Sequence, residues 1–456
     1  MSHWAILFVA ALLCLPVILL AAEAPANLLK NADFCVKGTG DLPADWIAWR
    51  PLLDQAACPM RQTEGGLRME TGQEPFSVGA VEQSAPGIRG GQAYRLRAEA
   101  QLSAIASPFR SVMVRLNWTC AGQPLTPHGW MVRGPVVTGT TAVFDDVLIA
   151  PSGADGASVR LEVKWPQGGS VLWRSVSMVP CETPTPRKTR LGAVYLKPQH
   201  STPEKNLDLW CEQIDAAGQL KLDAVCLGEA IGEVGTSKNP RDLAEAVPGP
   251  TTERLGAAAK KNNLYVVATL SERDGTHIYN TGVLLDREGR LAGKYRKTHL
   301  PREEWLKGVT PGTEYPVFQT DFGPVAIQIC YDWFFPAVAE TFALKGARVL
   351  FAPTWGTTFR DEDGRAEGET VFRVRSRDNG LVLVACVYDG SSLVIDPLGR
   401  ILATRTQEPG IAWAEVDLDR REPLFWVGSW PEVGPRDRMP ETYGPLTAAP
   451  EFPGKR

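Results

Sequence analysis

The sequence predicts two domains, an antiparallel β-sandwich over residues 25–180 followed by a layered α/β domain over residues 191–420. Three observations support this prediction. The chain has 456 residues, 44% of them apolar and 22% charged, which is too long for one ordinary core and typical of a folded protein. Its first half alternates apolar and polar residues with period 2. Its second half alternates short apolar runs with helical patterns, which is typical of layered α/β domains.

The period-2 segments of the first half are separated by Gly, Pro and Ser. Clear examples are Ala93–Ala100, Ser111–Trp118 and Ser158–Trp165, and residues 142–149 and 170–178 follow the same pattern. Strict alternation indicates a strand with one buried and one solvated face. Several such strands in succession predict an antiparallel sandwich.

A change of pattern separates the two halves. Residues 181–190 contain two prolines and almost nothing apolar, which favours a linker. Beyond it, 222–227, 264–270, 325–330 and 348–352 are expected to be buried strands, while 251–262 and 337–345 have helical spacing. A hairpin is expected across 286–289. The tail, 421–456, shows no clear period.

The N-terminus predicts export. Residues 5–22 are almost continuously apolar and are followed by Ala22-Glu23-Ala24, a small-x-small pattern. We therefore expect residues 1–24 to be a cleaved signal peptide, and the protein to be secreted or periplasmic. The alternative is an uncleaved helix that anchors the chain, because the apolar run is close to the ~18 residues that can span a bilayer.

Charge and cysteine usage narrow the functional classes. A formal net charge of -4 gives no basic footprint for nucleic acid, so no nucleic-acid partner is expected. In an oxidising compartment Cys35, Cys58, Cys120 and Cys181 could form two disulfides, with three possible pairings. No CxxC pair occurs and the chain has only five histidines. We therefore predict no metal site and no cofactor.

Three residues with useful chemistry are predicted to lie at strand ends. Cys330 closes the run 325–330 and precedes a helix opened by Pro336, a position that suits an exposed nucleophile. The turn leaves the backbone N–H of Tyr331 free to face an oxyanion. Lys297 follows a strand pair, and Glu229 follows the strand 222–227. Taken singly, each residue has an ordinary alternative role. Cys330 could be an inert buried thiol, Lys297 a solvated surface cation, and Glu229 a cap or surface residue.

The sequences around these residues resemble the nitrilase superfamily of carbon–nitrogen hydrolases. Gly293–Pro301 is similar to the lysine motif of that family, and Ile329–Pro336 with Pro353–Trp355 is similar to its cysteine motif. The similarity extends from about Leu191 to Asp419. It implies a four-layer α-β-β-α sandwich and hydrolysis of a non-peptide C–N bond. Where the family has Pro before its glutamate, this chain has Gly228.

The resemblance also implies a catalytic role for each residue. Glu229 would be the general base, with its pKa raised by burial. Cys330 would form a thioester, and Lys297 with the Tyr331 N–H would stabilise the oxyanion. The family uses a second, supporting glutamate, for which Glu303 and Glu304 are candidates. Glu304 is favoured by its distance from residues 311–312.

The expected activity is that of an amidase or carbamoylase that releases ammonia or an amine. Its substrate would be a small amide, carbamoyl compound or nitrile, and a nitrilase acting on C≡N is the first alternative. A second alternative is a catalytically inactive sugar-binding protein. A glycoside hydrolase would have no use for the Glu-Lys-Cys set. The resemblance also implies a homo-oligomer.

The N-terminal half resembles galactose-binding-like, carbohydrate-binding jelly rolls. The resemblance is carried by Asn27–Phe34 with Leu42–Trp46, and by residues 87–94. It implies a possible carbohydrate partner. The tryptophans Trp46, Trp49 and Trp118 either stack on sugar rings or fill the core of the sandwich.

Overall fold

The computed structural model describes residues 25–127, 129–356, 362, 364, 366–421, 423–424 and 428–448. The predicted signal peptide, 1–24, lies outside these ranges. Two compact units are present. The first holds the described residues up to Ala106 with Thr119–Gly122 and Gly134–Thr183, and the second holds Ser107–Trp118, Gln123–Arg133 and the residues from Pro184 onward. Within the described residues, no helix combines the length and apolarity needed to cross a bilayer.

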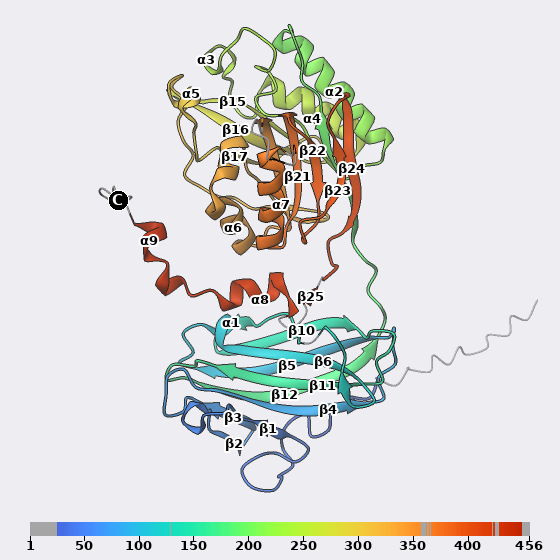
Figure 1. The fold of residues 1–456 in the computed structure, drawn as a ribbon, viewed down its shortest axis with the longest axis vertical. Coiled ribbons are helices and arrows are strands. Elements are labelled where there is room, and N and C mark those ends of the chain that lie inside the picture. The colour runs from blue at the N-terminus through green and yellow to red at the C-terminus, as the bar shows by residue number, and fades with distance from the viewer. Residues whose placement is uncertain are drawn as a thin grey trace, which may run out of the picture. The chain divides into compact units, whose positions relative to one another are not determined.

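The N-terminal region is built of antiparallel strands, as the period-2 pattern predicts (Figure 1). One sheet has the order β1 (Ile47–Trp49), β4 (Val78–Pro86), β11 (Gly156–Lys164), β6 (Val112–Cys120) and β7 (Gln123–Pro124), and β8 (Trp130–Met131) pairs with β6. The other has the order β2 (Met60–Thr63), β3 (Gly66–Glu70), β12 (Ser170–Cys181), β5 (Ala93–Ser103), β10 (Thr141–Ile149) and β9 (Val136–Thr138). The short elements η1 (Asp54–Ala56) and α1 (Pro108–Ser111) join strands. The jelly-roll family of this region stays a prediction.

Two of the three candidate sugar-binding tryptophans fill the interior. Trp46 is 5% exposed and Trp118 is 1% exposed, whereas Trp49 is 41% exposed. Only Trp49 therefore presents a ring to solvent, with the Arg160 guanidinium 5.0 Å from its centre. A carbohydrate ligand stays a prediction.

The first four cysteines of the described chain, which could have formed two disulfides, form none. Cys35, Cys58, Cys120 and Cys181 are all free thiols. Cys58 is buried with its Sγ 3.6 Å from the Ser77 hydroxyl, while Cys35 and Cys120 are exposed. Spacing along the chain could not show that one thiol is in the core while two lie on the surface.

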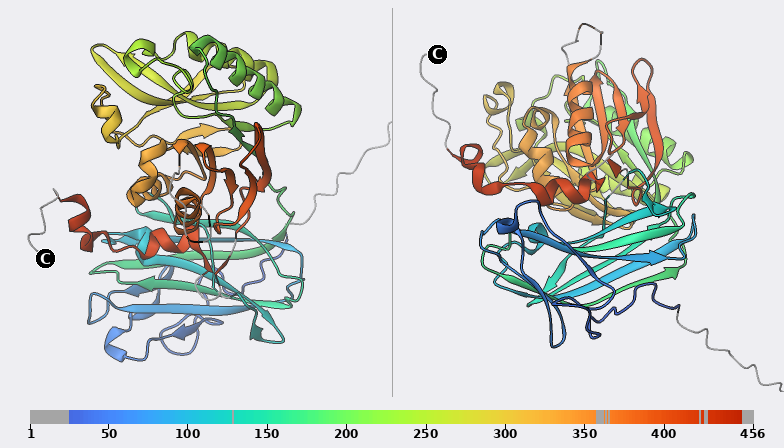
Figure 2. Two further views of the ribbon diagram at one scale, coloured as in Figure 1. Left: turned by 45° about the horizontal axis from the view of Figure 1, so that its top comes forward. Right: turned by 60° about the horizontal axis from the view of Figure 1, so that its bottom comes forward.

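The second domain contains two six-stranded sheets that pack face to face (Figure 2). The first has the order β17 (Leu291–Arg296), β16 (His277–Leu285), β15 (Tyr265–Asp274), β14 (Ala224–Cys226), β13 (Lys188–Tyr195) and β24 (Gly410–Asp417). The second has the order β18 (Phe318–Thr320), β19 (Gly323–Ile327), β20 (Val349–Gly356), β21 (Val382–Asp389), β22 (Ser392–Ile395) and β23 (Ile401–Arg405). The strands at the centre of each sheet are almost fully buried, which explains their continuous apolar sequences.

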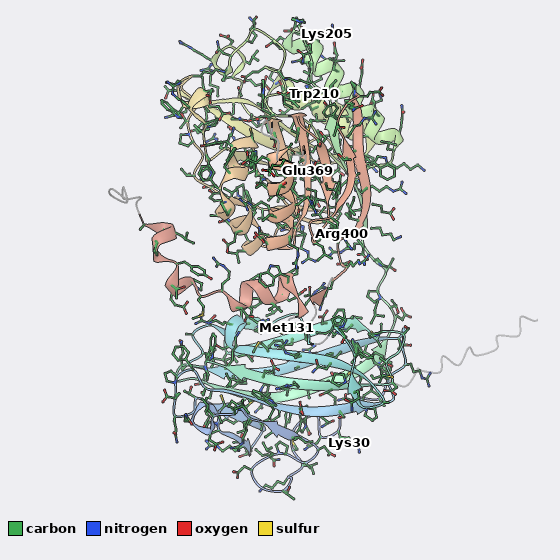
Figure 3. The ribbon with its side chains drawn as sticks, viewed as in Figure 1. Lys30, Met131, Lys205, Trp210, Glu369 and Arg400 are labelled. Atoms are coloured by element: carbon green, nitrogen blue, oxygen red, sulfur yellow. The ribbon has the colours of Figure 1, made fainter. Side chains whose placement is uncertain are left out.

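Helices cover the outer face of each sheet. On the first, α4 (Pro250–Asn262) contacts β15 and β16, and α2 (Pro203–Gln219) contacts α4 and β24. On the second, α7 (Glu367–Asn379) contacts β21 and β22, with α6 (Pro336–Leu344) beside it. Thr202 caps α2 by accepting the N–H of Lys205 at 3.3 Å. The inner face of α2 buries Trp210, which is labelled in Figure 3. This arrangement is the expected α-β-β-α sandwich.

The sequence pattern predicted no helix or strand in the tail, but the structure contains several. They are β25 (Pro423–Leu424), β26 (Gly428–Ser429), α8 (Trp430–Asp437), η3 (Pro440–Thr442) and α9 (Gly444–Thr447). The last three each have a proline in the first turn, where its missing N–H costs nothing. Three of the prolines in the tail therefore begin helices, while Pro435 lies inside α8.

A buried carboxylate holds the outer strands of the first sheet together. Glu272 on β15 is 2% exposed in its side chain and accepts hydrogen bonds from Lys294 at 2.5 Å and Arg296 at 2.7 Å, both on β17. Thr281 on β16 donates to it at 2.7 Å. Burial alone would raise the pKa of Glu272, but these donors outweigh it and lower the pKa to about 2.

We predict that Glu272→Gln lowers the free energy of unfolding by roughly 3 kcal/mol at neutral pH, as a shift from 4.5 to about 2 implies. Because the folded-state pKa is depressed, this stabilisation is complete above pH 4.5 and is lost as the pH falls toward 2. Thermal midpoints measured across this range should therefore converge for the variant and the wild type. Asp274→Asn is the matched control, because Asp274 also binds Arg296 but is 62% exposed. An equal deficit for Glu272→Gln at pH 2 and pH 7 would contradict the prediction.

Candidate active site

Three strand ends bring Glu229, Lys297 and Cys330 to one cleft. Glu229 follows β14, Lys297 is the first residue after β17, and Cys330 follows β19. All three line a cleft of about 470 Å³. The sequence placed them on separate segments, and the fold brings the segments together.

Glu229 and Glu304 share two hydrogen-bond donors. The ammonium of Lys297 donates to Oε1 of Glu229 at 2.9 Å and to Oε1 of Glu304 at 3.0 Å. The amide of Asn280 donates to the same two oxygens at 3.0 and 2.7 Å. The Lys297 side chain is 1% exposed and that of Glu229 is 4% exposed. A buried ammonium is therefore held between two carboxylates.

The number of donors leaves one N–H of Lys297 for a substrate. An ammonium has three donors, and the two carboxylates occupy two of them. Oε2 of Glu229 accepts the backbone N–H of Trp355 at 2.8 Å, and a carboxylate oxygen has a second lone pair. One cation donor and one carboxylate lone pair thus stay available in the cleft.

The electrostatic environment keeps Lys297 charged and the Cys330 thiol protonated. Burial alone would lower the pKa of Lys297, but the negative charges of Glu229 and Glu304 outweigh it and raise the pKa. Burial and the Glu229 charge raise the pKa of Cys330, and Lys297 opposes them only in part. Burial also raises the pKa of Glu304, against the opposing effect of Lys297. The resting site therefore contains a thiol, so attack requires a base.

Cys330 lies on a sharp turn rather than within its strand. β19 ends at Ile327, and Cys330 begins the short 3-10 helix η2 (Cys330–Phe334). Its φ of 39° is in the left-handed region, which is rare for a residue with a side chain and is found mainly at functional sites. Tyr331 is the second residue of η2, so its N–H has no partner within the helix.

Asp332 connects the cysteine turn to the lysine loop. It is completely buried, and its Oδ2 accepts the N–H of Ile329 at 2.9 Å and the hydroxyl of Tyr295 at 2.8 Å. Its Oδ1 accepts the hydroxyl of Thr298 at 3.2 Å and the N–H of His299 at 3.1 Å. Three of these partners are close to Lys297 in the sequence, and the fourth, Ile329, directly precedes Cys330. One carboxylate therefore fixes the Cys330 turn and the Lys297 loop relative to each other.

Gly228, the departure from the family motif, makes room for Tyr388. A Cβ at position 228 would overlap the Tyr388 ring. The Tyr388 hydroxyl donates to the Glu229 carbonyl oxygen at 2.6 Å, and the ring packs edge-on against Trp355 at 5.6 Å. Tyr388 on β21 therefore holds both the backbone of Glu229 and the residue whose N–H binds its carboxylate.

The structure places the other predicted residues as follows. Glu304 in α5 (Arg302–Trp305) contacts Lys297, whereas Glu303 is exposed at the cleft wall. Trp355 lines the cleft and is 40% exposed. Sequence reasoning missed Tyr388 and Glu233. The glycine at position 228 was the only signal for Tyr388, and Glu233 had none.

Comparison with known proteins identifies the family. Residues 190–424 match the model of the carbon-nitrogen hydrolase family, so the chain belongs to this family. The match begins near β13 and contains all the residues of the cleft described above. The prediction of a carbon–nitrogen hydrolase is thus confirmed.

Individual relatives match about half of the chain. Omega-amidase NIT2 of Xenopus tropicalis is 29% identical over 47% of this chain and 84% of the relative. A nitrilase of Pyrococcus abyssi is 30% identical over 50% of this chain and 90% of the relative. The solved structure of a carbon-nitrogen hydrolase from Helicobacter pylori is 25% identical, covers 58% of this chain and 99% of its own, and has a TM-score of 0.49.

We predict that Tyr388→Phe lowers kcat of the hydrolase about tenfold and leaves KM nearly unchanged, because it removes one hydrogen bond that aims Glu229. Steady-state kinetics, with the thermal midpoint measured separately, checks this. Tyr265→Phe is the matched control, because its hydroxyl also forms a hydrogen bond with the backbone, accepting the N–H of Asp321, but its partner does not line the cleft. Equal kcat losses in both variants would show that Tyr388 serves stability alone.

Proposed function

We propose that the protein is an amidase that hydrolyses a small non-peptide amide through a thioester on Cys330. The observation that carries the proposal is the buried cluster of Glu229, Lys297 and Glu304 beside the Cys330 thiol. It provides a nucleophile, a base and an oxyanion donor within one cleft, which are the three groups that acyl transfer requires.

Acylation begins with proton transfer from the thiol of Cys330 to Glu229. The sulfur attacks the amide carbon, and the carbonyl π bond becomes an oxyanion that accepts the third N–H of Lys297 and the N–H of Tyr331. When the intermediate collapses, the C–N bond breaks and the nitrogen takes the proton from Glu229. Ammonia leaves, and the acyl group stays on sulfur as a thioester.

Deacylation repeats these steps with water. Glu229 takes a proton from water, the hydroxide attacks the thioester carbon, and the same two donors hold the new oxyanion. The C–S bond then breaks, sulfur recovers the proton from Glu229, and the carboxylic acid leaves. Glu304 holds Lys297 and Asn280 in place throughout, because it accepts one hydrogen bond from each.

The cleft and the relatives together favour an amide as substrate. A volume of about 470 Å³ suits a small molecule. The relatives include an omega-amidase and a nitrilase. We favour the amide because the mechanism needs a leaving nitrogen that takes one proton from Glu229. Hydrolysis of a nitrile would require the addition of a second water.

We predict that wild-type protein releases ammonia from primary amides faster than from N-carbamoyl amino acids or nitriles of similar size. Cys330→Ala should reduce this release by at least ~10⁴-fold, because it removes the nucleophile. The control is Cys211→Ala on α2, which removes a free, partly buried thiol that does not line the cleft. An ammonia assay across the panel checks both statements. Turnover that survives in a folded Cys330→Ala protein would refute the proposal.

A further inference from the structure

The turn after Glu229 brings a second carboxylate, Glu233, back to the cleft. Ala230 has a φ of 48°, and its N–H donates to the Thr269 hydroxyl at 2.6 Å. The N–H of Glu233 then donates to the Ala230 carbonyl oxygen at 2.8 Å. This closes the turn and leaves Glu233 on the cleft wall beside Glu229.

A hydrogen bond from the sheet orients Glu233. The Ser271 hydroxyl on β15 donates to its Oε1 at 2.6 Å. Ser271 is directly opposite Asn280 on β16, so the two neighbouring strands both donate hydrogen bonds to carboxylates of the cleft. Among the described residues, nothing donates a hydrogen bond to Oε2 of Glu233, and no Lys or Arg forms an ion pair with it. One carboxylate oxygen is therefore available for a ligand.

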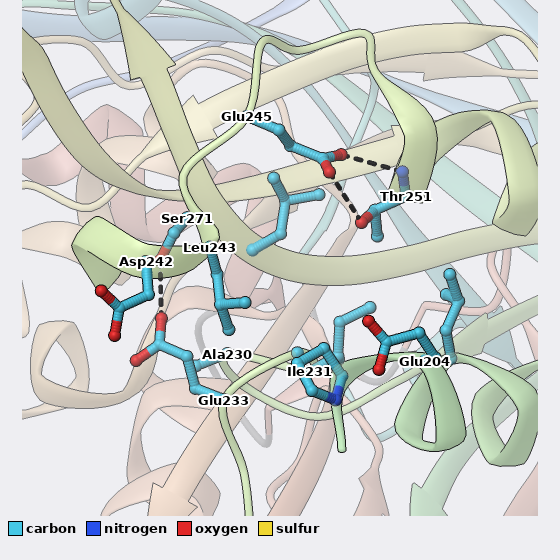
Figure 4. A pocket seen from close by; sticks show the side chains of 13 residues that line it. Glu204, Ala230, Ile231, Glu233, Asp242, Leu243, Glu245, Thr251 and Ser271 are labelled. Atoms are coloured by element: carbon cyan, nitrogen blue, oxygen red, sulfur yellow. Dashed lines mark hydrogen bonds between the residues drawn. The ribbon is translucent and has the colours of Figure 1, made fainter. Parts of the chain in front are cut away.

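Glu233 is also shared with a second cavity, of about 280 Å³, next to the cleft (Figure 4). Ala230, Glu233 and Ser271 line both spaces. The residues that line the second cavity include apolar side chains, such as Leu243, and no Lys or Arg. Figure 4 shows the hydrogen bond between Glu233 and Ser271 among the side chains that line this cavity. A substrate tail beyond Glu233 would therefore meet apolar groups and carboxylates.

We propose that Glu233 binds an ammonium group of the substrate, so that the preferred amides carry a protonated amine in their acyl part. This inference rests on the proposed amidase function and adds a substrate class to it. An ammonium would form a charge-assisted hydrogen bond with Oε2, while Ser271 keeps Oε1 in place. Glu233 would thus be a specificity-determining residue and take no part in bond breaking.

The charges around Glu233 set the direction of a pH effect. Burial raises the pKa of Glu233 to about 7, the charges of Glu229 and Glu304 act in the same direction, and the Ser271 hydrogen bond and Lys307 oppose them. The other ionisable residues lining the two spaces are Lys238, Lys297, Glu303 and Cys330 in the cleft, and Glu204, Asp242 and Glu245 in the second cavity. A carboxylate attracts an ammonium only when ionised, so the preference for a cationic substrate should grow as the pH rises through 7.

The test compares two amides of equal length, 5-aminopentanamide and hexanamide, which differ by an ammonium in place of a methyl group. For the wild type near pH 8, kcat/KM should favour the aminoamide by ~10–100-fold, the usual range for a hydrogen bond to a charged group. In Glu233→Gln the ratio should fall to near 1. The control Glu303→Gln, an exposed carboxylate of the same cleft, should keep the wild-type ratio.

Two further measurements decide the outcome. The wild-type ratio should rise from pH 6 to pH 8, while the amine of the substrate stays protonated, and in Glu233→Gln it should not change. If wild-type protein hydrolyses hexanamide but shows a ratio near 1, or prefers the carboxylate-bearing glutaramate, the inference on Glu233 fails and the amidase proposal stands. If the wild type hydrolyses none of the three, the amidase proposal fails as well.

Discussion

A single ammonium buried between two carboxylates is the constraint on which the site depends. Removing a charge from water costs several kcal/mol, and only close partners of opposite sign offset this cost. Lys297 has these partners in Glu229 and Glu304, and Asn280 donates to the same two oxygens. The ends of β14 and β17 and the start of α5 must therefore meet at one point. The same arrangement that offsets the cost of burying these charges leaves one N–H of Lys297 and one lone pair of Glu229 available for a substrate.

Two further buried contacts turn this cluster into a defined geometry. Asp332 fixes the cysteine turn against the lysine loop through both of its oxygens. Tyr388 fixes the backbone of Glu229 from the second sheet. The face-to-face packing of the two sheets is therefore part of the site, because Tyr388 and the strand before Cys330 belong to one sheet, and the strands before Glu229 and Lys297 belong to the other. A Cβ at position 228 would disturb this arrangement without touching any reacting atom.

Much of the fold could be predicted because its pattern is local. The alternation in 93–100 and the apolar run 264–270 correspond to β5 and β15, and the helical spacing of 251–262 corresponds to α4. The Glu, Lys and Cys motifs were also found, since each is a short continuous segment. Other features depend on contacts between distant segments. The reason for a glycine at position 228 is its contact with Tyr388, 160 positions later in the chain. The return of Glu233 to the cleft depends on the left-handed backbone of Ala230. The helical pattern of the tail was obscured by prolines, three of which begin its helices.

The central claim is that catalysis passes through an acyl group on Cys330, and the most direct test is to observe that group. Wild-type protein mixed with a primary amide and quenched in acid during turnover should gain the mass of the acyl group, less one hydrogen. Peptide mapping should place this adduct on Cys330, and hydroxylamine should release it as expected of a thioester. An adduct on a different residue, or rapid turnover with no adduct at any quench time, would contradict the account.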